Sequence, residues 1–352
     1  MKTIIHVIDS LRTGGAEKLL VQTVNSLQEY NNIVCYLHGP TDLKSEFKKC
    51  IFYDLGFKNN LDILNCSIRL RKIIRQVKPD IIHAHLLKST WISRLANDRG
   101  RTLLFTIHNI LSEDAFKVNK LSYYFEKLSY SSKQVIISVS NAALDDYKKW
   151  IGLKGASYVL YNPIDDRFFT GKKCKSVPTG NLKLVAVGNL KRQKNYFTLL
   201  QAFHFLKGTK VDLDIFGEGP EYYSLEKEII KNNFPVRLMG KNNDIASMLL
   251  NYDAYIMPSL FEGYGIAPVE AMASGLPVLL SNIQVLKEVS SNKAIYFDPL
   301  EPQDIARAIK DFIQMNEIEK IELSKSLMNQ AVSIGDQKQF KSRLLEIYNS
   351  IN

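Results

Sequence analysis

Short apolar runs alternate with longer amphipathic stretches along the whole chain. The runs that predict strands are Thr3–Ile8, Ile33–Leu37, Ile81–His85, Leu103–His108 and Val135–Ser140 in the first half, and Leu182–Val187, Val211–Phe216, Ala254–Met257 and Val278–Ser281 in the second. Strands that are apolar almost throughout and separated by helices are typical of a parallel sheet covered on both faces. The pattern therefore predicts an α/β protein with two Rossmann-like halves.

A polar stretch between the two halves predicts the division into domains. Residues 166–181 contain several lysines, glycines and Pro178 and have neither a strand nor a helix period, which indicates a linker. We expect one domain at 1–165 and a second at 182–337. Ligands of open parallel sheets bind beyond the carboxyl ends of the strands, so two such sheets facing each other would form one cleft.

Charge and composition narrow the class of protein. The chain has 352 residues and a net charge of +10, and residues 1–165 carry 23 Lys and Arg against 15 Asp and Glu. A basic half favours an anionic partner, such as a membrane surface or a lipid phosphate, or is merely a solubilising surface. No recognition motif for nucleic acid accompanies the charge. No window approaches the roughly 20 apolar residues of a membrane helix, and four cysteines without C-x-x-C spacing favour a reducing cytoplasm.

Two glycine-rich loops precede predicted helices. Gly14 and Gly15 follow the first strand, and their backbone N–H groups could approach an anion at a helix N-terminus. In the second half, Gly263, Tyr264 and Gly265 precede a helix that Pro268 should start.

Two glutamates flank the second of these loops. Glu262 lies within it, and Glu270 is expected in the first helical turn. Carboxylates accept hydrogen bonds from hydroxyl groups, which suits a sugar on one side of the anion and a ribose on the other.

Several segments share their spacing with one enzyme family. They are Gly14–Glu17, Thr106–Asn109 (T-x-H-[DN]), Val187–Asn195 (a phosphate-binding segment ending in Lys-Asn), Gly217–Pro220 (G-x-G-P) and Glu262–Glu270 (E-x7-E). As a set, they resemble the retaining glycosyltransferases of family 4 over nearly the whole chain. Ser138–Ser140 and Tyr161–Asp165 resemble the last strands before the family's hinge.

The resemblance implies the fold and the site. The fold would be GT-B, an α/β architecture of two Rossmann-like domains whose parallel sheets face each other across an interdomain cleft. The first domain would bind the acceptor, the second would bind the nucleotide sugar, and the last helix, 338–352, would return to the first domain. His108 would lie at the transferred sugar, Glu262 near its 3-hydroxyl and Glu270 at the ribose. The implied catalytic residues are His108 and Glu262, and the implied donor-binding residues are Gly14, Gly15, Lys191, Arg192, Lys194, Glu262, Gly263, Tyr264, Gly265 and Glu270.

The implied activity is that of a hexosyltransferase. A hexose or N-acetylhexosamine would pass with retention from a nucleotide sugar, most often a UDP-sugar, to a glycan or lipid-linked glycan in bacterial surface polysaccharide assembly. The reaction would take place in the cytoplasm or at the inner face of the cell membrane. The donor is a co-substrate, and no cofactor is expected.

One departure from the family keeps two alternatives open. The family's arginine after the glycine is Asn189 here, and a neutral amide lacks the charged, bidentate contact of arginine to phosphate. Lys191 or Arg192 could compensate. The alternatives are a nucleotide-sugar epimerase on the same fold and an inactive sugar- or membrane-binding accessory protein.

Other signals are given less weight. Asp212 and Asp214 resemble a D-x-D metal motif, but they lie inside an apolar strand, so a structural role is expected. His83 and His85 alternate on a strand, and no further Cys or His ligand is evident, so no metal site is predicted. Gly217 and Gly219 lack the third glycine of a dinucleotide fingerprint.

A basic and aromatic segment follows His108. Its residues are Phe116, Tyr123, Tyr124, Phe125 and Tyr130 with Lys117, Lys120, Lys127 and Lys133. An amphipathic helix of this kind can lie in a membrane interface, although an ordinary solvated helix face fits the same pattern.

Overall fold

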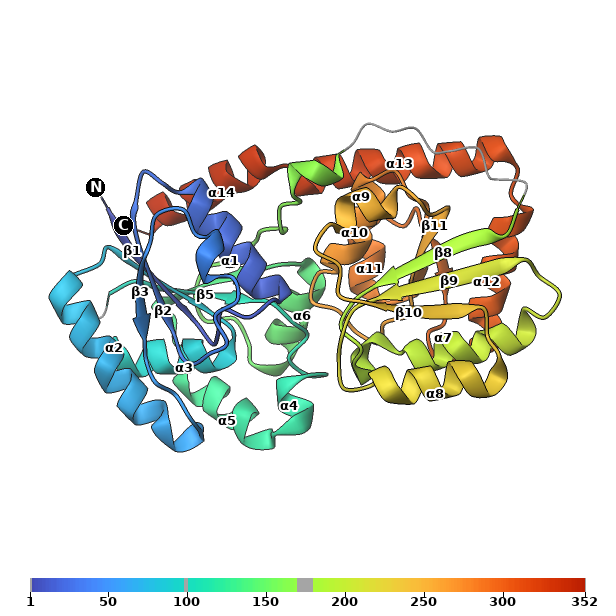
Figure 1. Cartoon of the computed structure of the whole chain (residues 1–352). Helices are drawn as coiled ribbons and strands as arrows, with labels where there is room; N and C mark the ends of the chain where they lie inside the picture. Colours follow the sequence, from blue (N-terminus) through green and yellow to red (C-terminus); the bar gives the residue numbers. More distant parts are fainter. Residues whose placement is uncertain (1, 98–100, 170–179, 352) are drawn as a thin grey trace. The chain divides into compact units, whose positions relative to one another are not determined.

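The computed structural model describes residues 2–97, 101–169 and 180–351, which form two compact units (Figure 1). The first unit comprises Met1–Asn162 and Lys338–Asn352, and the second comprises Pro163–Gln337. The central part of the predicted linker, 170–179, lies outside the described residues. At its start, Asp166–Phe168 form a short 3-10 turn, η3, so this part of the segment is not extended.

The first unit contains, within its described residues, one sheet of seven parallel strands. Their order is β3 (Ile51–Asp54), β2 (Asn31–Tyr36), β1 (Thr3–Ile8), β4 (Ile81–His85), β5 (Leu103–Ile107), β6 (Gln134–Ser138) and β7 (Ser157–Val159). Helices cover both faces, as the apolar strands predict. They are α1 (Gly15–Ser26), α2 (Ile63–Val77), α3 (Leu87–Ala96), α4 (Ala115–Val118), α5 (Lys120–Ser129), α6 (Asn141–Trp150) and α14 (Gln337–Ser350).

Alternate residues of β1 point to opposite faces of this sheet. Ile5 and Val7 belong to a core formed with α2, α3 and α6. Ile8 belongs to a separate core on the other face, where it packs with residues of α1. This alternation is that of any strand, in which successive side chains point to opposite sides.

The second unit is built in the same way around six parallel strands, counted within its described residues. Their order is β10 (Val236–Gly240), β9 (Val211–Phe216), β8 (Leu182–Val187), β11 (Ala254–Met257), β12 (Val278–Ser281) and β13 (Ile295–Phe297). The helices are α7 (Tyr196–Ala202), α8 (Tyr222–Asn232), α9 (Ile245–Leu249), α10 (Ile266–Ala273), α11 (Gln284–Val289), α12 (Pro302–Gln314) and α13 (Glu317–Gly335).

The strand order reverses once in each sheet. In the first unit the reversal falls between β1 and β4, and in the second it falls between β8 and β11. Loops diverge from the carboxyl ends of two such strands, and ligands of open α/β sheets bind in the crevice between them. The topology therefore predicts ligand sites at the loops after β1 and β4 in the first unit and after β8 and β11 in the second.

The predicted α/β class with two parallel sheets is confirmed. The sequence pattern missed the edge strands β3, β7, β10 and β13, which are short and, in part, exposed. The expected strand at Tyr161–Asp165 is wrong, because the last strand of the first unit is Ser157–Val159 and the chain continues without regular structure.

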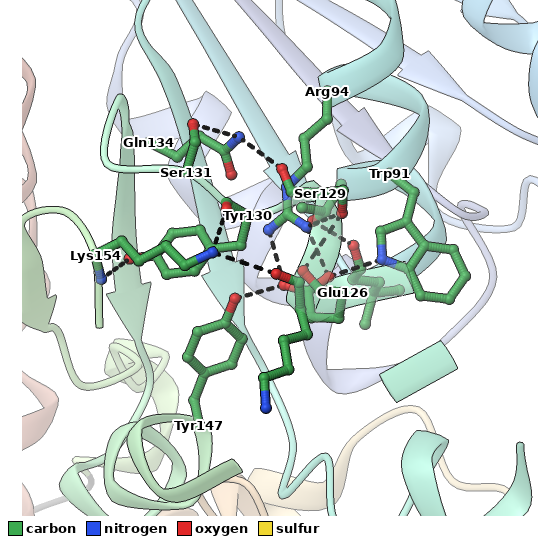
Figure 2. A network of polar contacts seen from close by, with 12 residues as sticks. Trp91, Arg94, Glu126, Ser129, Tyr130, Ser131, Gln134, Tyr147 and Lys154 are labelled. Atoms are coloured by element: carbon green, nitrogen blue, oxygen red, sulfur yellow. Dashed lines mark hydrogen bonds and ion pairs between the residues drawn. The ribbon is translucent and has the colours of Figure 1, made fainter. Parts of the chain in front are cut away.

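A buried ion pair fixes α5 to its neighbours (Figure 2). The carboxylate of Glu126 accepts hydrogen bonds from both terminal guanidinium nitrogens of Arg94 and from the indole of Trp91, each at 2.7–2.8 Å. The hydroxyl of Tyr147 on α6 donates a further bond at 2.5 Å. Since Arg94 and Trp91 belong to α3, one carboxylate joins three helices.

No helix in the described part of the chain is long and apolar enough to cross a bilayer.

Candidate functional site

Two loops of the second unit meet where the strand order reverses. The loop after β8 contains Gln193 and Lys194, and the loop after β11 contains Phe261 and Glu262. The amide of Gln193 donates to the carbonyl of Phe261 at 2.8 Å, and the ammonium of Lys194 donates to Oε1 of Glu262 at 2.6 Å. The side chains of Lys194 and Glu262 are 16% and 9% exposed, so this ion pair is largely shielded from water. Two residues predicted for the donor site are thus in direct contact.

The residue after Lys194 has a left-handed backbone conformation. Asn195 has a φ of 57°, a conformation that Asn and Gly adopt more readily than other residues. Its side chain donates to the carbonyl of Pro299 at 2.6 Å and accepts from Thr198 at 2.7 Å. The Lys-Asn pair in the sequence motif therefore has a physical reason: the asparagine makes the turn that holds the lysine toward Glu262.

Close packing of backbones explains the glycines of the neighbouring loop. Gly217 has a φ of 149°, and a Cβ at this position would collide with the carbonyl oxygen of Gly188. A Cβ on Gly219 would likewise collide with the backbone of Leu190. The loops after β8 and β9 can therefore lie against each other only without side chains at these two positions.

The loop after β11 leads into α10. Gly265 has a φ of 84° and stands immediately before the helix, which begins at Ile266. Gly263, Tyr264 and Gly265 thus precede a helix N-terminus, where the helix dipole favours an anion. The helix starts two residues earlier than Pro268 suggests, so the expected place of Glu270 in the first turn is wrong and Glu270 lies in the second turn.

Two buried tyrosines interact electrostatically with the predicted glutamates, and the sequence analysis missed both. Burial raises the pKa of Tyr196, and the charge of Glu262 adds to this effect. Burial also raises the pKa of Tyr255, with further contributions from Tyr196, Glu262 and Glu270. Both glutamates therefore act electrostatically on one buried ring. Tyr196 could have been noticed from the sequence, because it stands two residues after Lys194.

The basic residues near Asn189 are exposed. Asn189, Lys191 and Arg192 all face solvent on the loop after β8. Arg192 lies near Glu221, whose pKa is raised by burial and lowered by the arginine. The two cations predicted to compensate for the missing arginine are thus on the same loop as Asn189 and Lys194, and Arg192 already interacts with a carboxylate.

The remaining predicted residues lie in the first unit. Gly14 caps the N-terminus of α1, but the carboxylate of Glu17 occupies the space where a side chain of residue 14 would stand. Burial raises the pKa of Glu17, which Ser10 and Arg12 contact. An acidic group of the chain itself therefore lies next to Gly14, where an anion is expected to bind.

His108 directly follows β5 at the carboxyl edge of the first sheet. Its Nε2 lies 3.4 Å from Nδ1 of His85, and burial of the ring lowers the pKa of His108 to about 3. The imidazole is neutral near pH 7, so it can form hydrogen bonds with hydroxyl groups but does not carry a positive charge.

The D-x-D motif has the predicted structural role. Asp214 accepts two hydrogen bonds from the guanidinium of Arg237 at 2.7 Å and one from the hydroxyl of Tyr252 at 2.6 Å. Asp212 accepts from the amide of Asn181. Both oxygens of Asp214 and one oxygen of Asp212 are thus engaged by side chains of the second unit.

The expectation that His83 and His85 have no further histidine neighbour is wrong. His6 on β1 lies beside them, and one ring nitrogen from each of the three lies within 4.8 Å of the others.

The sequence matches two family models that lie end to end. Residues 13–168 match the model described as Glycosyltransferase Family 4, and residues 171–331 match the model described as Glycosyl transferases group 1.

Similar curated proteins and solved structures agree with these matches. An uncharacterised 41.2 kDa protein of the cps region of Klebsiella pneumoniae is 23% identical, over 82% of this chain and 83% of its own length. The UDP-Gal:α-D-GlcNAc-diphosphoundecaprenol α-1,3-galactosyltransferase of Escherichia coli is 24% identical, over 73% of this chain and 75% of its own. The structure of Anabaena HepE in complex with UDP and glucose superposes with a TM-score of 0.85, at 19% identity, over 99% of this chain and 100% of that one. With both family models matched and two parallel α/β sheets of the expected topology, the chain belongs to the family 4 type of glycosyltransferases, which have the GT-B fold.

Proposed function

We propose that this glycosyltransferase moves a hexose or N-acetylhexosamine, with retention and without a metal, from a UDP-sugar to a glycan or lipid-linked glycan of a bacterial surface polysaccharide. The observation that carries the proposal is the shielded Lys194–Glu262 pair at the strand-order reversal, beside Glu270 and the N-terminus of α10. The similar structure bound to UDP and glucose and the relative named for a UDP-galactose donor support the choice of donor.

The chemistry of the donor assigns a task to each group. Cleavage of the bond between the anomeric carbon and phosphate leaves its electron pair, and hence negative charge, on the nucleoside diphosphate. Lys194 and the helix dipole of α10 supply positive potential for that charge, which is the task a metal ion performs in other enzymes. Glu270 would accept hydrogen bonds from the ribose hydroxyls, and Glu262 would accept one from a sugar hydroxyl while keeping Lys194 in place.

Retention requires the acceptor oxygen to bond to the anomeric carbon on the side from which the diphosphate departs. The proton of the acceptor hydroxyl then has to leave as the new bond forms. Because His108 is neutral near pH 7, it suits hydrogen bonding to the sugar better than neutralising the leaving group. The roles of His108, Gly14 and Gly15 remain predictions that rest on the resemblance.

Ligand-dependent stability tests the donor site directly. Thermal unfolding is measured with UDP, GDP, ADP or NAD, each with EDTA, for the wild type, Glu270→Ala and the control Glu322→Ala, which changes an exposed glutamate of α13. A ligand at about 100 times its Kd stabilises a protein by about 2.7 kcal/mol. We expect a shift with UDP in the wild type and in the control and no shift in Glu270→Ala. A shift with GDP or ADP alone would refute the choice of UDP, and none with any diphosphate would favour the accessory-protein alternative.

Product analysis tests the reaction type. NMR of the glycoside formed from an α-linked UDP-sugar should show an α-linkage if the enzyme retains configuration. A β-linkage would contradict the proposal. Interconversion of the nucleotide sugar in the absence of any acceptor would instead support the epimerase alternative.

We also propose that the first unit contacts an anionic membrane through α4 and α5. Four apolar side chains, Val118, Leu121, Tyr124 and Leu128, are each 58–85% exposed and form what we name the α4–α5 ridge. Lys117, Lys120 and Lys127 surround the ridge and are exposed. Apolar side chains flanked by lysines suit the boundary between lipid headgroups and acyl chains. A relative named for a diphosphoundecaprenol acceptor supports a membrane-bound substrate.

The ridge differs from the aromatic face expected from the sequence. Phe116 and Tyr130 are buried in the core, and of the five aromatic residues only Tyr124 is widely exposed. Leucine and valine therefore supply most of the exposed apolar surface.

Sedimentation with vesicles tests this surface. We expect the wild type to bind vesicles that contain phosphatidylglycerol and to bind pure phosphatidylcholine vesicles much less. The double variant Leu121→Ser/Leu128→Ser should lose this binding, whereas Ile318→Ser, at a similarly exposed position of α13, should keep it. Equal sedimentation of the two variants would contradict the assignment of the ridge.

A further inference from the structure

Three histidines gather on one face of the first sheet, next to His108, whose Nε2 lies 3.4 Å from Nδ1 of His85. His6 on β1 stands directly opposite His83 on β4 in the strand register, and His85 follows two residues later on the same face. All three side chains are at most 2% exposed. One ring nitrogen from each lies within 4.8 Å of the other two. The sheet itself thus fixes three imidazoles around one point.

Hydrogen bonds leave nitrogen lone pairs inside this cluster. Nε2 of His6 lies 3.4 Å from Oδ1 of Asn32, and the amide nitrogen of Asn32 donates to two backbone carbonyls. The oxygen of Asn32 is therefore an acceptor and Nε2 of His6 is the donor, so Nδ1 of His6 carries a lone pair. This atom is buried and has no hydrogen-bond partner among the described residues, and the same is true of Nε2 of His85.

His83 has the surroundings of a metal-bound histidine. Its Nε2 lies 2.7 Å from the hydroxyl of Thr106, and its Nδ1 lies 2.8 Å from the hydroxyl of Tyr348 on α14. A hydroxyl can turn to donate or to accept. A metal would therefore replace one hydroxyl and leave the other to accept from the remaining ring N–H, as outer partners of metal-bound histidines do.

We propose that His6, His83 and His85 bind one late first-row transition metal ion, with Zn²⁺ as the reference case. Neutral imidazoles suit Zn²⁺, Cu²⁺ and Ni²⁺ better than Mg²⁺ or Ca²⁺. All three rings are buried, so the ion would lie in a place shielded from water.

The geometry needs only a small adjustment. Zn–N bonds of 2.0–2.1 Å place tetrahedral nitrogens about 3.3 Å apart, so the widest separation in the cluster would close by about 1.5 Å through ring rotation. A cavity of about 10 Å³ borders His83, His85 and Thr106 and is also lined by residues of α1 and α14. This is roughly the space of one water molecule, which could complete the coordination. The ion would tie β1 to β4 and, with Tyr348 as the remaining outer partner of His83, to α14.

Metal titration of untagged protein tests the site. The protein is treated with EDTA, exchanged into metal-free buffer and titrated with ZnCl₂, and bound zinc is counted by mass spectrometry. Separately, CoCl₂ is added and the visible spectrum is recorded, because tetrahedral Co²⁺ absorbs far more strongly than octahedral Co²⁺. We expect one ion per chain, a raised unfolding temperature of the first unit and a tetrahedral cobalt spectrum.

Histidine variants locate the ion. His6→Gln and His85→Gln should bind at least about 100-fold more weakly, since the loss of even an outer partner costs 10- to 100-fold. His204→Gln, which changes an exposed histidine of the second unit, should bind as the wild type does. The cobalt spectrum of the wild type decides the question even if a variant fails to fold.

Two results would overturn the proposal: less than one equivalent of zinc bound without a tetrahedral cobalt spectrum, or binding that is unchanged in both cluster variants. Because the donor test includes EDTA, a UDP-induced shift in metal-free protein keeps the fate of this site separate from that of the proposed function.

Discussion

Replacing Glu126 by alanine should unfold the first unit far more readily than any surface substitution. Glu126 is fully buried and accepts four hydrogen bonds, and the side chain of Arg94 is only 4% exposed. The guanidinium also lies 4.8 Å from the ring centre of Phe105. Without the carboxylate, Arg94 would keep its charge in a place that water barely reaches. Breaking a buried ion pair in this way costs about 3–5 kcal/mol.

The loss of unfolding free energy in Glu126→Ala depends on the unpaired charge of Arg94 and not only on the lost hydrogen bonds. The double variant Glu126→Leu/Arg94→Met removes both charges and keeps most of the buried volume. Replacing both partners of a buried pair by apolar groups is often close to neutral. We therefore expect the double variant to be considerably more stable than Glu126→Ala, although it removes more hydrogen bonds. The comparison is a direct measure of the coupling between the two residues.

Tryptophan fluorescence can follow the unfolding of the first unit separately from that of the second. The chain has two, Trp91 and Trp150, and both belong to the first unit. Urea unfolding followed by tryptophan fluorescence therefore reports on that unit alone. Glu113→Ala is the control, because Glu113 and Lys117 form an exposed pair in the first unit and such pairs contribute at most about 1 kcal/mol. A loss below 1 kcal/mol in Glu126→Ala, or a double variant that is less stable than it, would refute the reasoning.

Further predictions concern the donor unit and the first glycine loop. Lys194→Ala leaves Glu262 buried without its cation, so we expect circular dichroism to show a loss of about 3 kcal/mol and the thermal shift with UDP to vanish. Burial raises the pKa of Glu17 above its ordinary value of 4.5. The contribution of protonated Glu17 to the free energy of unfolding is therefore full at acid pH and is lost as the pH rises through the raised pKa. In urea unfolding, Glu17→Gln should weaken this pH dependence and should be more stable than the wild type at neutral pH. Gly217→Ala should destabilise the second unit by more than 1 kcal/mol, because of its positive φ and the blocked Cβ position; a melting temperature equal to that of the wild type would contradict this. Asn189→Arg should tighten UDP binding in calorimetry by about tenfold, the effect of one charge-assisted contact, and unchanged affinity would show that residue 189 does not face the phosphates.

The central strands could be predicted because their sequence pattern is unambiguous. Runs such as Ala254–Met257 and Val278–Leu280 are apolar on both faces, which a covered parallel strand requires. The edge strand Ile51–Asp54 contacts one neighbour only, and its ends are exposed. It is only four residues long, so no period could reveal it, although Ile, Phe and Tyr favour strands.

The candidate site could be predicted in its residues but not in its contacts. The motif spacing identifies Lys194 and Glu262, yet their ion pair joins positions 68 residues apart and depends on the pairing of β8 with β11. The histidine cluster shows the same limit, because only the register of β1 against β4 places His6 beside His83. Glu126 is a further example. Within a lysine-rich helical segment it resembles a solvated residue, and its burial follows from α3 and α6.

The loss of the family's arginine does not leave the donor loop without positive charge. Lys194 is held by Glu262 inside the site, and this pair is stable only if both members stay, because either charge alone would be buried and unpaired. Lys191 adds a second cation on the same loop, and it forms no ion pair among the described residues. Charge at this loop is thus retained at two positions around Asn189, which favours a working donor site with weaker phosphate binding over a degenerate one.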